Sequence, residues 1–399
     1  MPPPPPAKAR HIAVPSWTTV IPVLAALCLV LVWGRVPGTV LVVVIALVLG
    51  GAVIGSVHHA EVVAHRVGEP FGSLVLAVAV TVIEVALIVT LMISGGAAAS
   101  SLARDTVFAA AMITMNGIVG LSLLVGARRY GTANFNAEGA GAALATVASL
   151  AGLTLVLPSF TTSRPGPEFS PAQLAFAACA SLLLYAMFVM AQTVRNREFF
   201  LPVEAATPPP PILGAAENFA DPHFPNRPVN NSTSLPAERI PDVDTRPTAQ
   251  TALKSLGLLL VSLIAVVGLA KVESPAIEGV VASVGFPQSF VGVLIALLVL
   301  LPESLAAVRA ARRNRVQTSL NLAYGSAMAS IGLTIPAIAI ASIWLSGPLL
   351  LGLGPTQMVL LALTVMVGAL TVVPGRATRL QGGVHLILFT AFMFLSIYP

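Results

Sequence analysis

Two glutamates interrupt long apolar stretches of this sequence at matching positions. Glu84 follows Phe71 by 13 residues, and Glu303 follows Phe290 by 13 residues, with no other charged residue in between. At 1.5 Å per residue, each would lie about 20 Å along a helix, deep in a bilayer core of about 30 Å. An acidic side chain at that depth costs about 2.5 to 3.5 kcal/mol. A role in ion or proton binding is therefore favoured over a protonated glutamate that only hydrogen-bonds a neighbouring helix.

Two carboxylates at one buried site can hold either a cation or protons. Ca²⁺ takes about six to eight oxygen ligands, and two carboxylates neutralise its charge. Without a cation, two poorly solvated carboxylates repel each other, so that proton uptake is favoured. Because the cation and the protons would compete for the same oxygens, such a site predicts exchange, with Glu84 and Glu303 titrating as a coupled pair. Thr81, one turn before Glu84, could add a hydroxyl ligand or bond only its own helix, and these alternatives stay open.

The composition identifies the protein class that must position these residues. The chain of 399 residues is 56% hydrophobic and only 9% charged, which indicates a polytopic membrane protein. The net charge of +5 does not indicate a nucleic-acid partner, because basic residues in membrane proteins mostly mark cytoplasmic loops. Cys28 and Cys179 lie in apolar stretches, so no disulfide framework is expected. No cofactor is expected; the predicted partners are the lipid bilayer, transported cations and protons, and a homo-oligomer stays open.

Apolar runs between polar or Gly/Pro breaks predict an all-α fold of eleven transmembrane helices. They cover residues 17–33, 37–57, 71–94, 105–127, 139–157, 170–192, 252–271, 286–310, 317–345, 355–373 and 382–398. Pro287, Pro302 and Pro336 are predicted to break or kink the eighth and ninth spans.

The polar segments divide the chain into two transmembrane halves. Residues 1–15 form a proline-rich tail and residues 193–251 a proline-rich linker, and both are predicted to be disordered. The halves are then residues 16–192 and 252–399. Among the Asp and Glu residues, only Glu84 and Glu303 are expected deep within a span.

The distribution of basic residues predicts the orientation. With a cytoplasmic N-terminus, 17 of the 21 Lys and Arg residues fall in cytoplasmic segments. The expected topology is therefore N-terminus inside and C-terminus outside, in a cell membrane.

Five helices per repeat, an odd number, force two successive repeats into opposite orientations. With the glutamates aligned, LVLAVAVTVIEVAL (residues 74–87) matches VLIALLVLLPESLA (residues 293–306). This predicts one extra helix followed by two inverted five-helix repeats, with a site near the midplane where they meet.

Three stretches of the sequence resemble the ChaA-type bacterial calcium/proton antiporters, of the calcium/cation antiporter superfamily. They are GEPFGS…VTVIEVALIV (residues 68–89), RDTVFAAAMITMNGIVGLSLLVGARRY (residues 104–130) and LLPESLAAVRAARRNRVQTSLNLAYGSAMASIGLTIP (residues 300–336). The resemblance implies a ten-helix core of inverted repeats, a bacterial inner-membrane location, and glutamate ligands at Glu84 and Glu303. It also implies hydroxyl or amide ligands, for which the candidates are Thr81, Asn116 and Ser326. For Asn116 ligation is favoured over interhelix bonding, and for Ser326 ligation and close packing are balanced.

The sequence departs from the superfamily at the residues before each glutamate. TVIE at Thr81 to Glu84 and LLPE at Leu300 to Glu303 replace the common GNxxE-like pattern, and no polar residue stands one turn before Glu303. Fewer oxygens suit a hydrated or a monovalent cation. The resemblance implies Ca²⁺, exchanged for H⁺, as the substrate, and the missing oxygen ligand keeps Na⁺ or K⁺ as the alternative.

Other functions are less well supported by the sequence. No nucleophile motif or metalloprotease motif points to an enzyme. A channel would need more acidic residues along a pore or a carbonyl filter. The loop with His58, His59 and His65 lacks the rest of a zinc set and is expected to be a solvated loop end rather than a pH sensor. Glu69 in this loop could serve as a cytoplasmic entry ligand.

Overall fold

The computed structural model describes residues 17–35, 37–68, 71–203, 247–344 and 347–399. The tail 1–15, Glu69 and most of the linker 193–251 lie outside the described residues, so their predicted disorder and role stay predictions.

The described chain is built from helices with one very short sheet. In the first half, the α-helices are α1 (Trp17–Val32), α2 (Thr39–Val67), α3 (Phe71–Gly95), α4 (Leu102–Met112), α5 (Val119–Tyr130), α6 (Ala137–Ala151) and α7 (Pro171–Met190). In the second half they are α8 (Ala249–Ser283), α9 (Phe290–Val299), α10 (Leu301–Arg312), α11 (Val316–Ala341), α12 (Pro355–Val372) and α13 (Arg379–Ile397). The strands β1 (Ala133–Asn134) and β2 (Arg376–Ala377) pair antiparallel.

The eleven predicted spans all correspond to helices. The second continues to Val67, so His58, His59 and His65 lie on α2 and not in a solvated loop; His59 is buried, with its Nε2 2.9 Å from the carbonyl oxygen of Thr18. Among the described residues, nine helices are long and apolar enough to cross a membrane, and the bent pair α9–α10 makes a tenth span. The shorter apolar helix α1 corresponds to the eleventh. The predicted class, a polytopic all-α membrane protein, is confirmed.

Local sequence signals set several helix starts. Asn136 accepts hydrogen bonds from the backbone N–H groups of Glu138 and Gly139 at the start of α6. Ser170 and Gln173 form a capping box before α7, where Pro171 occupies the first turn. These residues satisfy N–H groups that a helix start leaves unpaired.

Two spans depart from regular α-helix near their middle. The axis bends by 53° between α9 and α10, next to Pro302, as predicted. The fourth span passes from α4 to α5 through a π-helical turn, η2 (Ile113–Ile118). Pro336 was expected to break or kink the ninth span, but α11 continues through it to Ala341. A proline removes only one backbone hydrogen bond, and tight packing around the buried Pro336 can hold the helix together.

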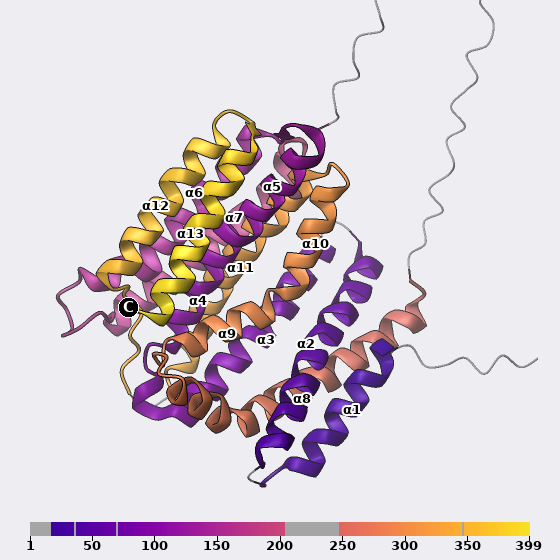
Figure 1. Cartoon of the computed structure of the whole chain (residues 1–399), viewed down its shortest axis with the longest axis vertical. Coiled ribbons are helices and arrows are strands. Elements are labelled where there is room, and N and C mark those ends of the chain that lie inside the picture. Colours follow the sequence, from indigo (N-terminus) through magenta and orange to yellow (C-terminus); the bar gives the residue numbers. More distant parts are fainter. Residues whose placement is uncertain (1–16, 36, 69–70, 204–246, 345–346) are drawn as a thin grey trace, which may run out of the picture.

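The helices alternate between two ends of the bundle, which we name the basic end and the tie end. At the basic end, β1 pairs with β2, Tyr130 Oη donates to the carbonyl of Arg312, and Arg379 donates to the carbonyl of Arg128. The connections after α5, α10 and α12 meet there, at the top of Figure 1. At the tie end, the starts of α4 and α12 come together, as Arg104 donates to the carbonyl of Gly352.

Helix α8 corrects one expectation about charge. The seventh span was predicted to end at residue 271, but α8 runs for 35 residues to Ser283. It therefore includes Glu273, which is buried, so Glu84 and Glu303 are not the only acids enclosed within a span. The charged residues and Pro275 ended the apolar run without ending the helix.

Glycines bring several helices into backbone contact. A Cβ on Gly382 of α13 would lie 2.6 Å from the backbone nitrogen of Leu124 on α5. A Cβ on Gly268 of α8 would lie 2.5 Å from the side chain of Leu29 on α1. Helices α1, α2 and α8 form a group at one side of the bundle (Figure 1).

Candidate functional site

A cavity of about 340 Å³ lies between α3, α7, α10 and α11, and both Glu84 and Glu303 line it. Its polar lining consists of Thr81, Glu84, Tyr185, Gln192, Glu303, Thr318, Asn321, Ser326 and Ser330. The two glutamates are the only charged residues among those that line it. Helices from both halves of the chain thus bring the two isolated carboxyl groups, 219 positions apart, to one cavity.

Glu84 is held on α3 by a contact with α11. Its side chain is 4% exposed, and Ser330 Oγ donates a hydrogen bond to Glu84 Oε1 at 2.5 Å. Thr81, one turn earlier on α3, is also buried and lines the same cavity. Thr334 lies one turn beyond Ser330 on α11, and its buried side chain also faces the Glu84 carboxylate. Three hydroxyl groups therefore come from the helix turns around the Glu84 carboxylate.

Glu303 occupies the start of a half-helix. It is the third residue of α10, just after the 53° bend, and its side chain is 7% exposed. The start of a helix carries a partial positive charge and free N–H groups, which stabilise an anion. In the described part of the chain, Glu303 Oε2 is buried and has no hydrogen-bond partner. The bend thus places one carboxylate where its charge is stabilised but its Oε2 atom is free for a ligand.

This donor set suits a hard cation or protons. Carboxylate and hydroxyl oxygens are the ligands that Na⁺, K⁺ and Ca²⁺ prefer. No group of three or more His, Cys, Asp or Glu side chains with metal-binding geometry occurs among the described residues. Any cation here would therefore rely on two carboxylates, hydroxyl groups and retained water.

The cavity extends toward the basic end. Its lining on α11 runs from the exposed Thr318, near the start of the helix, to the buried Ser330, about 18 Å farther along the axis. Gln192, just after α7 at the end of the sixth span, lines the same entrance. The glutamates lie along this route, so access from the basic end is the geometry that this conformation offers.

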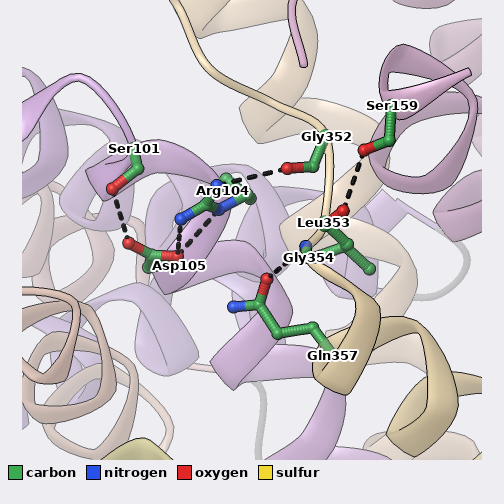
Figure 2. Close-up of polar contacts among 8 residues, drawn as sticks. All are labelled: Ser101, Arg104, Asp105, Ser159, Gly352, Leu353, Gly354 and Gln357. Carbon is green, nitrogen blue, oxygen red and sulfur yellow. Dashed lines mark hydrogen bonds and ion pairs between the residues drawn. The ribbon is translucent and has the colours of Figure 1, made fainter. Parts of the chain in front are cut away.

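The opposite end is held together by the contacts that we name the tie. Arg104 forms an ion pair with Asp105 (2.8 Å) and donates to the carbonyl of Gly352 (3.2 Å). Ser101 donates to Asp105 (2.8 Å), and Ser159 donates to the carbonyl of Leu353 (2.8 Å). Figure 2 shows how these side chains fasten the segment before α12 to the start of α4. The tie lies at the end of the bundle away from the cavity entrance, where Arg104 and Asp105 also line a second cavity of about 280 Å³.

The predicted site residues fall into three groups. Thr81 and Ser326 line the cavity with the two glutamates. Glu69 lies outside the described residues. Asn116 does not line the cavity, and its role as a ligand stays a prediction.

Asn116 belongs to a separate buried network. Its Nδ2 donates to Thr364 Oγ1 at 2.8 Å, and its Oδ1 lies 3.1 Å from His385 Nδ1. His385 Nε2 lies in turn 3.2 Å from Thr371 Oγ1. This network joins η2 to α12 and α13, so in this conformation both ends of the Asn116 amide are engaged away from the carboxylates.

Ser330 is the partner of Glu84 in the cavity, and the sequence analysis did not identify it. It follows Ser326 by four residues, and residues four apart lie on the same face of a helix. That spacing, within the segment already compared with the antiporters, was the available signal.

Comparison with known proteins agrees with this arrangement. Residues 36–194 and 254–398 match the sodium/calcium exchanger protein family. The chain is 42% identical over 396 residues to the protein named "Putative ionic transporter y4hA" of Sinorhizobium fredii, covering 98% of this chain and 99% of that protein. It is 32% identical over 390 residues to the sodium-potassium/proton antiporter ChaA of Escherichia coli, covering 97% and 96% of the two chains.

The fold is also that of solved structures. The native YfkE structure aligns with a TM-score of 0.65 at 15% identity, covering 96% of this chain and 99% of that one. The structure of the H⁺/Ca²⁺ exchanger CAX aligns with a TM-score of 0.65 at 15% identity, covering 94% and 86%. At this identity the likeness concerns the fold alone. With the family match on both halves of the chain and the whole-length relatives, the chain belongs to the sodium/calcium exchanger protein family, a family of membrane cation antiporters.

Proposed function

We propose that this protein exchanges a cation for protons by alternating access, with Glu84 and Glu303 binding both. The observation that carries the proposal is the single cavity in which these two buried carboxyl groups meet. A membrane-embedded acid is costly to keep without a ligand or a proton, so two in one cavity favour a site that always holds one or the other.

This conformation corresponds to the first half of the proposed transport cycle. The cavity reaches the carboxyl groups from the basic end, while at the other end the tie joins the start of α4 to the segment before α12. Protons leaving Glu84 and Glu303 would free their oxygens for a cation entering by the same route. Opening at the tie end and closing at the basic end would then complete the exchange. Thr81, Ser326 and Ser330 are the proposed hydroxyl ligands.

We propose Ca²⁺ as the cation. Two carboxylates match its charge, and the hydroxyl groups in the cavity add to its oxygen ligands. Na⁺ or K⁺ is the second candidate. It is supported by the apolar residues before Glu303, Leu300 and Pro302, where the superfamily has a polar ligand, and by the name of the Escherichia coli relative, a sodium-potassium/proton antiporter.

We also propose the orientation predicted from the basic residues. The basic end would face the cytoplasm, the tie end the outside, and the segment 193–251 would be a cytoplasmic tether between the two halves. In this conformation, the cavity would then be open to the cytoplasm.

Transport by purified protein in sealed proteoliposomes tests the proposal. The vesicles contain a pH-sensitive dye, and Ca²⁺, Na⁺ or K⁺ is added outside at equal ionic strength. Saturable proton movement driven by Ca²⁺ is expected. Movement driven only by Na⁺ or K⁺ would replace Ca²⁺ with the second candidate. No proton movement with any of the three cations would overturn proton-coupled exchange.

A further inference from the structure

A further carboxyl group, with no ion-pair partner among the described residues, is enclosed in the bundle outside the exchange site. Glu273 lies on α8, is only 1% exposed, and does not line the cavity. Its Oε2 atom is buried with no hydrogen-bond partner among the described residues. Ser262, 11 residues earlier, is also buried with an unpartnered Oγ. At 100° per residue the two side chains point to nearly the same side of α8, the side that packs into the protein.

No basic group in the described chain neutralises Glu273. Lys271 is exposed and lies over the ring of Trp33, with its Nζ 5.6 Å from the ring centroid. Two residues turn a helix by about 200°, so Lys271 and Glu273 point to opposite sides. The two ion pairs found among the described residues involve other acids.

The helices that pack against α8 bring few titratable groups to this region. Helix α1 has Cys28 alone, which lies within electrostatic reach of Glu273. Helix α3 has Glu84 alone, α9 has none, and α2 has none from Thr39 to Val57. On α8 itself, Glu278 accepts a hydrogen bond from Ser274 and is partly exposed. Arg35, in the connection after α1, is exposed.

The charge on Glu273 follows from these surroundings. Burying a carboxylate without a counter-charge or a full set of hydrogen bonds costs roughly several kcal/mol. The neutral acid is therefore the stable form of Glu273. Helix α8 packs against α3, which carries Glu84. Because α8 packs against α3, a movement of α3 on opening at the tie end would also change the surroundings of Glu273.

We propose that Glu273 is a second proton-binding site, separate from the cation site, which holds a proton while the tie end is closed and loses it when that end opens. The protein would then bind one proton that no cation displaces directly. The transport part of this inference rests on the proposed exchange function, whereas the protonation of Glu273 does not.

Infrared spectroscopy of the purified full chain tests the protonation directly. Glu273→Gln should remove a protonated-carboxyl band that wild type shows at neutral pH. The matched control Glu278→Gln changes a partly exposed acid on the same helix and should keep that band. A spectrum of Glu273→Gln identical to wild type in this region would overturn the proposal. Should Glu273→Gln fold poorly, Glu273→Met offers an apolar side chain of similar size, and the band should be absent there too.

The pH dependence of transport tests the coupling. In proteoliposomes, the slope of log rate against pH on the tie-end side should fall by up to about one in Glu273→Gln, because one proton fewer is released there when that end opens. Glu278→Gln should keep the wild-type slope. An unchanged slope in Glu273→Gln would overturn the coupling to transport. If wild type moved no protons, the proposed exchange function would fail, and the infrared comparison would still decide whether Glu273 holds a proton.

Discussion

Removing the hydroxyl group of Ser330 should weaken cation binding by a calculable amount. Ser330 Oγ donates a hydrogen bond to Glu84 Oε1 at 2.5 Å in a buried environment. A hydrogen bond to a charged group contributes about 1.5 to 3 kcal/mol. A cation needs Glu84 as the anion, so Ser330→Ala should lower apparent cation affinity roughly 10- to 150-fold, since about 1.4 kcal/mol is a factor of ten.

The assay is the cation concentration that gives half-maximal proton movement in proteoliposomes, measured at alkaline pH to limit proton competition. Ser319→Ala is the matched control, because Ser319 is a buried serine on the same helix that bonds Ser122 at 2.6 Å and does not line the cavity. Half-maximal concentrations that are equal in Ser330→Ala and Ser319→Ala would refute the reasoning that Ser330 stabilises the charged Glu84.

Three further predictions concern topology, the linker and packing. A reporter fused at Pro399 should be active only outside the cell, and activity only in the cytoplasm would contradict the proposed orientation. Shortening residues 207–245 should leave exchange largely intact, because the halves need only a tether; loss of transport by a normally inserted variant would assign the linker a gating role. Gly382→Ala should destabilise the protein by about 1 to 3 kcal/mol, because its Cβ would meet the Leu124 backbone. In the control Gly383→Ala, the added Cβ meets nothing within 4 Å, and the melting temperature in detergent should stay at the wild-type value. Equal melting temperatures for the two variants would contradict this close contact.

The spans and the pairing of the two glutamates could be predicted because both follow from one strong constraint. A bilayer demands long apolar runs, and a charge within such a run is costly enough to need a partner or a function. The structure brings Glu84 and Glu303 to one cavity, as the alignment of the two halves predicts. Pro302 likewise indicated the bend beside Glu303.

The partners of these side chains could not be predicted, because they depend on contacts between distant segments. Ser330 is one of many serines in apolar helices, and its bond to Glu84 spans 246 positions. The partner of Asn116 on α13, His385, is 269 positions away. A local pattern shows that a polar residue is buried but does not show which helix will face it.

The length of α8 was missed for a different reason. A hydropathy reading ends a span at its first charges, here Lys271 and Glu273. A helix continues as long as its backbone hydrogen bonds can form, and α8 extends three turns beyond that point.

The most direct test of the account replaces each cavity glutamate and measures cation-driven proton movement in proteoliposomes. Glu84→Gln and Glu303→Gln keep the side-chain size and one carbonyl oxygen, while removing the charge and the exchangeable proton. Each variant should insert and fold as well as wild type, since a desolvated charge is lost, yet move protons no faster than protein-free vesicles. Exchange at the wild-type rate in either variant would show that its carboxyl group is structural, and would contradict a single site shared by cation and protons.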